Sequence, residues 1–313
     1  MILIKPGFWD KKIGLISIIL SPFSFLFFII IFLKKKFTKV LTFEIPIICV
    51  GNIYVGGTGK TPTSILLAEQ INRLGRNSAI LRSYHANHED EYNLIRDSYK
   101  NLIISRNRID AIKKAIKLNC DILILDDGLQ DYRIKKNLNI VCFNSNQLIG
   151  NGLIFPAGPL RESLDALKEV DVVLINGEKS KNFEEKILKI NKKIEIFYST
   201  YQATNIEKFK NKKLLAVAGI GNPENFFKLL EDNNLKIEKK LIFPDHYKFS
   251  KEEIHSIVEE AKMNDYQIVM TEKDYFKIKD YKINGIEYLK IYLKIYNQEK
   301  LLTKINKLHD KNF

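Results

Sequence analysis

The sequence predicts an α/β protein: a mostly parallel sheet with helices on both faces, a second, smaller α/β domain, and an apolar N-terminal helix. Three observations predict this fold class. Apolar strand-like runs alternate with segments of helical periodicity, one strand leads into a glycine-rich turn, and an uncharged stretch stands near the N-terminus. The domain boundaries that we expect are 1–40 for a membrane anchor, 41–205 for the first α/β domain and 206–313 for the second.

The composition is that of a folded protein with two domains of ordinary size. The chain has 313 residues, and a hydrophobic share of 45% excludes a disordered chain. The formal charge is +13, but no RNP-like, zinc or helix-turn-helix motif accompanies it, so we expect no nucleic-acid partner. Cys49, Cys120 and Cys142 lack metal-like spacing, and Cys49 and Cys142 lie inside apolar strand-like runs, which indicates buried thiols in a reducing compartment.

The first element is the uncharged run 13–33, which lysines bound on both sides at 11–12 and 34–36. As a helix it would be about 32 Å long, enough to cross the hydrocarbon core of a bilayer. No small-residue cleavage site follows it, so a retained membrane anchor is favoured over a signal peptide. Pro22 leaves open whether this helix spans the membrane or is only partly inserted, and the lysines would meet anionic head groups.

A phosphate-binding loop follows the anchor. The apolar strand 45–50 leads into a glycine-rich turn, and residues 63–74 carry apolar positions at helical spacing. The nucleotide-binding residues expected from this loop are Val55, Gly56, Gly57, Thr58, Gly59, Lys60 and Thr61. Lys60 supplies a positive charge for phosphate, and the Thr61 hydroxyl is a ligand for Mg²⁺. Tyr54 stands where the usual phosphate loop has its first glycine.

The metal-binding carboxylates are expected after a neighbouring strand. The apolar run 122–125 ends in Asp126, Asp127 and a turn glycine. A phosphate-loop enzyme needs an acidic residue at this place to hold its metal ion. Thr61, Asp126 and Asp127 are therefore the predicted Mg²⁺ ligands.

The remaining elements continue the βα repeat and then begin a second unit. We expect strands at 79–81, 101–104, 122–125, 138–143 and 172–175, and helices at 63–74, 110–118 and 163–169. A Lys-rich segment at 179–193 and a polar stretch to 213 form the expected connection between the domains. The second domain is predicted to contain strands 214–218, 237–242, 266–270 and 286–293 and helices 224–231, 250–263 and 297–309.

Six motifs in one order resemble the tetraacyldisaccharide 4′-kinase family. They are GNIYVGGTGKTP at 51–62, LILDDGLQ at 123–130, NGLIFPAGPLRE at 151–162, AVAGIGNP at 216–223, FPDH at 243–246 and MTEKD at 270–274. Together they span about 230 residues of the chain and are far more specific than GGTGKT alone. The resemblance implies an ATP- and Mg²⁺-dependent kinase with a phosphate-loop domain and a smaller C-terminal α/β domain.

The resemblance also implies roles for single residues. Lys60 is the phosphate lysine and joins the catalytic group, in which Asp90 is the base and His246 its partner. Arg161 and Glu162 match the Arg-Glu pair after the PAGP turn, and Arg108 matches an arginine on the phosphate side. We therefore add Arg108, Arg161 and Glu162 to the predicted nucleotide-binding residues.

The chain departs from the family pattern near Asp90. The family usually reads Ser-Arg-Gly-Tyr-Gly-Gly where residues 81–86 stand, and a longer stretch precedes its Asp-Glu pair. Glu89 replaces a glycine, and Asp131 replaces a histidine after DDGLQ. These differences concern the assignment of Asp90 as the base more than the assignment of Lys60 as the phosphate lysine.

Two further motifs are not assigned to nucleotide binding. The lysine and aspartate of MTEKD are adjacent, which does not fit a guanine-binding motif, and GIGNP is interpreted as a turn.

The function expected from this resemblance is transfer of the γ-phosphate of ATP to the 4′-hydroxyl of a tetraacylated glucosamine disaccharide 1-phosphate in lipid A biosynthesis. The expected partners are this lipid A disaccharide precursor and the lipids of the inner membrane, with the catalytic domains on the cytoplasmic side and no protein partner evident. The alternative is a membrane-docked phosphate-loop switch ATPase that acts on a protein partner.

Overall fold

The computed structural model describes residues 5–86, 88–245 and 247–310, without the side chains of Asp90, His309 and Asp310. Contacts within the chain form two compact units, each discontinuous in sequence. The large unit comprises 5–84, 101–200 and 295–310, and the small unit comprises 85–100 and 201–294. Residues 85–100, which we expected in the first domain, thus group with the small unit, and 295–310, which we expected in the second, group with the large unit.

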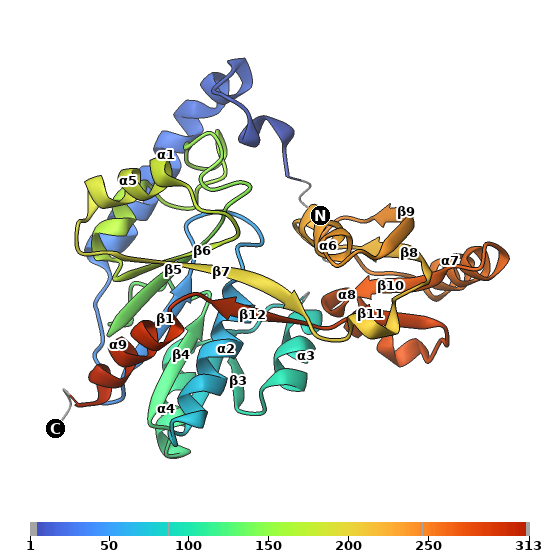
Figure 1. The fold of residues 1–313 in the computed structure, drawn as a ribbon. Coiled ribbons are helices and arrows are strands. Elements are labelled where there is room, and N and C mark those ends of the chain that lie inside the picture. Colours follow the sequence, from blue (N-terminus) through green and yellow to red (C-terminus); the bar gives the residue numbers. More distant parts are fainter. Residues whose placement is uncertain (1–4, 87, 246, 311–313) are drawn as a thin grey trace. The chain divides into compact units, whose positions relative to one another are not determined.

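An eight-stranded sheet with the order β12-β7-β6-β5-β1-β4-β2-β3 forms the core of the large unit, although residues 291–294 of β12 and 201–203 of β7 group with the small unit (Figure 1). Its strands are β1 (Ile47–Gly51), β2 (Ser78–Ser83), β3 (Leu102–Ser105), β4 (Ile122–Asp126), β5 (Leu138–Asn144), β6 (Val172–Asn176), β7 (Glu195–Ala203) and β12 (Ile291–Ile295). The ladders from β3 across to β7 are all parallel. The predicted parallel sheet is confirmed, and its central strands are buried on both faces, as their continuous apolar runs require.

Helices cover both faces of this sheet. Neighbouring residues of a strand point to opposite faces, so each buried strand offers side chains for packing on both. The helices of the large unit are α1 (Leu15–Phe37), α2 (Lys60–Arg73), α4 (Arg108–Lys117), α5 (Lys181–Ile190) and α9 (Gln298–Asp310). Ala79 and Leu81 of β2 pack in one apolar cluster with Ile112 of α4. Ser78, which has the opposite orientation, donates its hydroxyl to the carbonyl of Ala68 in α2 at 3.2 Å.

The small unit repeats this arrangement around four parallel strands in the order β11-β10-β8-β9. Its elements are α3 (Glu89–Ser98), β8 (Lys213–Ala218), α6 (Pro223–Asp232), β9 (Lys236–Ile242), α7 (Lys251–Met263), β10 (Gln267–Thr271), α8 (Glu272–Ile278) and β11 (Ile286–Leu289). Leu215 and Val217 of β8 pack in one cluster with α7, and Leu214 and Ala216 pack in another with α6. The predicted second α/β unit is thus present.

Three predicted elements differ from the structure. The strand expected at 286–293 is divided at Lys290, because the backbone of this residue bonds Thr204 and Asn205 instead of a strand neighbour. The helix expected at 163–169 is the 3-10 helix Leu164–Glu169. The Lys-rich connection contains α5, whose buried Phe183 and Ile187 form the apolar stripe of an amphipathic helix.

The cysteines have the environment that the sequence predicted. Cys49, Cys120 and Cys142 are free and buried. Burial raises the pKa of the Cys49 thiol to about 11 and that of Cys142 to about 12. Both thiols are therefore protonated and unreactive at neutral pH.

Candidate active site

The phosphate loop connects β1 to α2, and its glycines allow a backbone that other residues rarely adopt. Gly56 has φ 131° and Gly59 has φ 89°, both in the region that favours glycine. Gly59 is also the N-cap of α2, so Lys60 and Thr61 open the helix. Because a helix N-terminus presents unpaired N–H groups and a positive dipole, this turn can receive phosphate oxygens.

Two buried asparagines hold the loop, and sequence reasoning missed both. Asn52 donates its side-chain amide to the carbonyl of Gly56 at 3.2 Å and to the hydroxyl oxygen of Thr58 at 3.0 Å. Asn176, at the end of β6, donates to the carbonyl of Thr58 at 2.5 Å. Bonds within the chain therefore fix the loop conformation, which lowers the entropy cost of binding.

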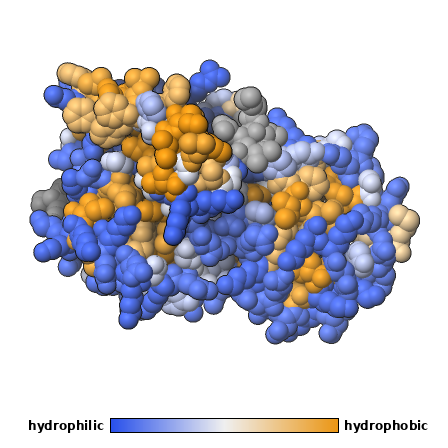
Figure 2. Space-filling model, turned by 90° about the horizontal axis from the view of Figure 1, so that it is seen from above, coloured by the Kyte–Doolittle hydropathy of each residue, from blue (hydrophilic) through white to orange (hydrophobic). Residues whose placement is uncertain are grey.

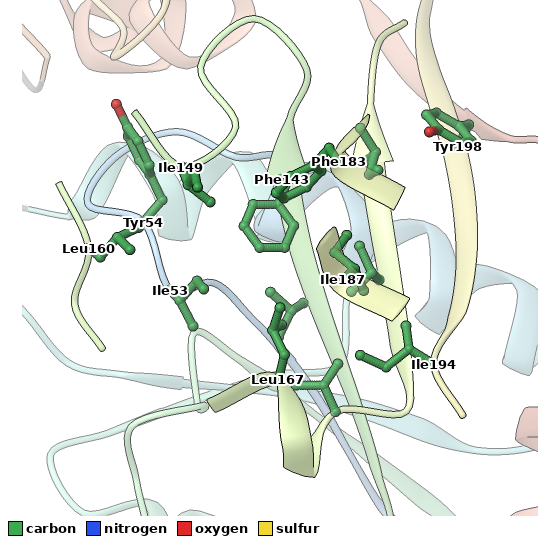
Figure 3. Packing of buried hydrophobic residues seen from close by; sticks show 14 residues of the cluster. Ile53, Tyr54, Phe143, Ile149, Leu160, Leu167, Phe183, Ile187, Ile194 and Tyr198 are labelled. Atoms are coloured by element: carbon green, nitrogen blue, oxygen red, sulfur yellow. The ribbon is translucent and has the colours of Figure 1, made fainter. Parts of the chain in front are cut away.

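The structure explains why Tyr54 stands where the usual loop has a glycine. Its side chain is fully buried, and Figure 3 shows its ring beside Ile149 and Leu160 with the hydroxyl directed away from the cluster. The hydroxyl donates to the carboxylate of Asp10 at 3.3 Å. Burial, and then the Asp10 charge, raise the pKa of Tyr54. The phosphate loop is thus attached to the segment that precedes α1.

The carboxylate of Asp126, at the end of β4, is fully buried and has three hydrogen-bond donors. It accepts from the hydroxyls of Thr61 at 3.0 Å and Ser64 at 3.1 Å, and it forms an ion pair with Arg82. Arg82 also donates to the Thr61 oxygen at 3.0 Å. Arg82 and Ser64 were not predicted as site residues, although Arg82 lies in the segment that matches a family motif.

Asp127 faces two cations of the predicted site. Arg161 donates to both of its carboxylate oxygens, at 2.9 and 3.1 Å, and the Lys60 ammonium lies 3.8 Å away. Burial alone would raise the pKa of Asp127, but Lys60 and then Arg161 hold it well below its usual value. Burial lowers the pKa of Lys60, and Asp127 opposes this shift. Lys60, Arg161 and Asp127 are therefore one charge cluster beside the phosphate loop.

Arg108 and Glu162 take structural partners near this cluster. Arg108 donates to the backbone carbonyl of Asp127 at 2.6 Å and lies 3.6 Å from the carboxylate of Asp131. Glu162 accepts from Gln130 at 2.8 Å and from the Tyr132 hydroxyl at 2.7 Å. Both residues thus support the turn after β4.

Thr61 and Asp126 fit the requirements of a Mg²⁺ site. Mg²⁺ prefers oxygen ligands, keeps several waters and is commonly held by one or two protein groups together with substrate phosphates. A hydroxyl oxygen and a carboxylate lie together here at the N-terminus of α2. Among the described residues, no group of three or more His, Cys, Asp and Glu side chains could hold a metal ion by itself.

The sequence neighbours of the predicted catalytic pair lie in the small unit. Asp90 is the second residue of α3, but its side chain and all of His246 lie outside the described part of the chain. Their sequence neighbours are described. The ammonium of Lys273 lies 2.9 Å from the carboxylate of Asp245 and 3.5 Å from that of Glu91. Lys273 therefore connects the segments that carry Asp90 and His246.

The MTEKD and GIGNP motifs meet in one buried network. Asp274 is fully buried and accepts from the backbone N–H of Gly219 at 2.6 Å, from the Thr271 hydroxyl at 2.7 Å and from Lys277 at 2.6 Å. These bonds tie the turn after β8 to the start of α8. The aspartate of MTEKD is thus structural, and GIGNP is the turn that the sequence predicted.

Comparison with known proteins decides the family. The profile described as "Tetraacyldisaccharide-1-P 4'-kinase" matches residues 16–310. The chain belongs to this family. A tetraacyldisaccharide 4′-kinase of Pelagibacter ubique is 40% identical over 98% of this chain and 99% of its own length. A tetraacyldisaccharide 4′-kinase from Francisella tularensis subsp. novicida is 36% identical over 92% of this chain and 98% of its own length. The resemblance inferred from six motifs is confirmed.

The fold of the family is also found among solved structures. The crystal structure of LpxK from Aquifex aeolicus in complex with ATP aligns with a TM-score of 0.70. The alignment covers 94% of this chain and all of that one, at 24% sequence identity. The architecture is thus shared at 24% sequence identity, well below the 40% and 36% of the two relatives above.

Arg82 gives a prediction about stability. Replacing Arg82 by Met leaves the Asp126 carboxylate buried without its cation, so we expect the free energy of unfolding to fall by about 3–5 kcal/mol. Arg73→Met, at an exposed position at the end of α2, should change it by less than about 0.5 kcal/mol. Urea denaturation followed by circular dichroism measures both. Equal effects of the two substitutions would contradict this role of Arg82.

Proposed function

We propose that this chain transfers the γ-phosphate of ATP to the 4′-hydroxyl of a tetraacylated glucosamine disaccharide 1-phosphate. The observation that carries the proposal is the cluster of Lys60, Arg161 and Asp127 beside the phosphate loop, in a member of this family. Phosphoryl transfer needs little covalent chemistry from the protein. Positioned charges and backbone N–H groups supply most of the rate.

The phosphate loop and its neighbours serve the phosphate side of the reaction. The backbone N–H groups of 56–61 bind phosphate oxygens, and Lys60 neutralises charge on the transferred group. Arg161, partly exposed beside Asp127, faces the charge that spreads over the phosphoryl oxygens. Thr61, Asp126 and Asp127 would hold Mg²⁺, which when bound neutralises phosphate charge.

Asp90 and His246 serve the acceptor side, as the family resemblance implies. Asp90 orients the 4′-hydroxyl and accepts its proton, and His246 holds Asp90 and takes up charge. The salt bridges from Lys273 to Glu91 and Asp245 support this pairing, because they connect the residues next to Asp90 and His246. A carboxylate of ordinary basicity suffices if the transition state is loose.

The apolar helix α1 supports a place at the membrane. It is the one described helix that is long and apolar enough to cross a bilayer. Most of its large side chains are exposed, and Figure 2 shows apolar side chains gathered around it. Ser17 contacts Asn151 at 3.2 Å, Ser24 contacts Ile154 at 2.8 Å and Lys35 contacts Glu169 at 2.9 Å.

The spacing of these contacts favours a helix that lies in the membrane surface. At about 100° per residue, Ser17, Ser24 and Lys35 fall within about 20° of one another and extend over about 27 Å of the helix. A spanning α1 would take the polar backbone that it contacts into hydrocarbon, at high cost. We therefore infer that α1 lies in the cytoplasmic surface of the inner membrane, with its exposed face among the lipids.

The kinase proposal predicts that ATP consumption depends on the lipid acceptor. With Mg-ATP and the tetraacylated disaccharide 1-phosphate, the protein should form phosphorylated lipid and hydrolyse little ATP without it. Lys60→Ala should lower transfer by about 10²- to 10³-fold, because it removes a charge that stabilises the transition state. Labelled ATP and thin-layer chromatography give both rates. Hydrolysis that is indifferent to the lipid would favour a switch ATPase instead.

The pairing of Asp90 and His246 predicts an effect of Lys273. Lys273→Met removes the bridge between their segments and should lower kcat by about tenfold or more, because small displacements at a reacting group are costly. Lys279→Met, at an exposed site just after α8, is the matched control and should be close to wild type. Initial rates at saturating ATP and lipid acceptor give kcat for both variants. A Lys273→Met protein with normal kcat would separate this salt bridge from catalysis.

The membrane proposal predicts which residues are accessible from the cytoplasm. The exposed positions Lys12 and Lys39 flank α1, and the natural cysteines are buried, so single cysteines can be placed at either end. Lys12→Cys and Lys39→Cys should both react with an impermeant maleimide in inside-out membrane vesicles. A spanning helix would protect one of the two until detergent is added.

A further inference from the structure

We propose that Ser24 in α1 is a positioning residue for phosphoryl transfer, acting through the segment 151–162 on Arg161. This inference rests on the proposed kinase function. It gives the apolar helix a second role beside lipid contact, because one of its few polar side chains holds a loop of the active site.

The contacts of Ser24 reach across the chain to the backbone of this segment. Its hydroxyl donates to the carbonyl of Ile154 at 2.8 Å and accepts from the N–H of Ala157 at 2.9 Å. The alternative acceptor in its own helix, the carbonyl of Leu20, is 3.5 Å away. Ser24 is 8% exposed and Ala157 is fully buried, so water does not readily replace these bonds.

The same segment is held by the turn that precedes α1. The indole N–H of Trp9 donates to the carbonyl of Pro156 at 3.1 Å, and the Trp9 ring lies edge-on to Phe155 with centroids 6.1 Å apart. The backbone N–H of Asn151 donates to the Trp9 carbonyl at 2.7 Å. Residues before and between the two partners of Ser24 are therefore also held by the N-terminal part of the chain.

The segment continues directly into the phosphate site. The carbonyl of Pro159 accepts from the N–H of Val55 at 2.8 Å, and the N–H of Arg161 donates to the carbonyl of Ile53 at 2.7 Å. The Arg161 guanidinium then binds Asp127. An unbroken path of short contacts thus leads from Ser24 to the arginine that faces the transferred phosphoryl group.

Ser21 offers a matched control on the same helix. It is exposed, and its hydroxyl donates to the carbonyl of Ile18 in its own helix at 2.7 Å. Ser21→Ala and Ser24→Ala remove the same group from neighbouring turns. Only Ser24→Ala deprives Ala157 and Ile154 of their partner, so any difference between the variants comes from the loop contact.

The activity test is a double-mutant cycle in the full chain with vesicles of inner-membrane lipids. Ser24→Ala should lower kcat by about tenfold with unchanged vesicle binding, whereas Ser21→Ala should match wild type. If Ser24 acts through Arg161, its effect should largely disappear in an Arg161→Ala background. Equal losses in both backgrounds, or no difference from Ser21→Ala, would overturn the inference. A wild-type protein that phosphorylates no lipid would instead count against the proposed function.

Trp9 gives a second readout that needs no activity. It is the one tryptophan of the chain, is 3% exposed and contacts the same segment. Ser24→Ala should increase quenching of its fluorescence by acrylamide, and Ser21→Ala should not. If Ser24→Ala folds poorly, the isosteric pair Ser24→Thr and Ser24→Val replaces it, with the hydroxyl again the only difference. Identical quenching within that pair would also overturn the inference.

Discussion

The buried carboxylate of Asp126 is the constraint on which the site depends. A charge without solvent must be compensated by donors, and Asp126 obtains them from Thr61 and Ser64 of α2 and from Arg82 of β2. These bonds fix the start of α2 against β4 and so determine where the phosphate loop lies. Asp127, the next residue, turns toward Lys60 and Arg161 and brings the cations of two distant segments together.

Much of this arrangement could be predicted from the sequence. Parallel strands with continuous apolar runs, and a glycine-rich turn before a helix, placed Lys60, Thr61 and Asp126 at one sheet edge. The family resemblance added Arg161, which single-sequence reasoning would not connect with Asp127, since 34 residues separate them. Local patterns identify the elements well because each strand and helix carries its own periodicity.

The rest depends on contacts that no local pattern encodes. In the sequence alone, Arg82 is an ordinary residue of β2 and Ser24 is a polar interruption in a lipid-facing helix. Only the structure shows their partners. The division at Lys290 follows from hydrogen bonds to residues 204 and 205, more than 80 positions away. The grouping of α3 with the small unit likewise reflects its contact with α8 and not its place in the sequence.

We expect this charge cluster to transfer phosphate to one hydroxyl of a lipid. Phosphorus–proton correlation in nuclear magnetic resonance, after reaction with Mg-ATP, locates the new phosphate on the product. We expect a single monoester whose phosphorus couples to the proton at the 4′ carbon. A phosphate at another hydroxyl, or inorganic phosphate as the only product, would contradict it.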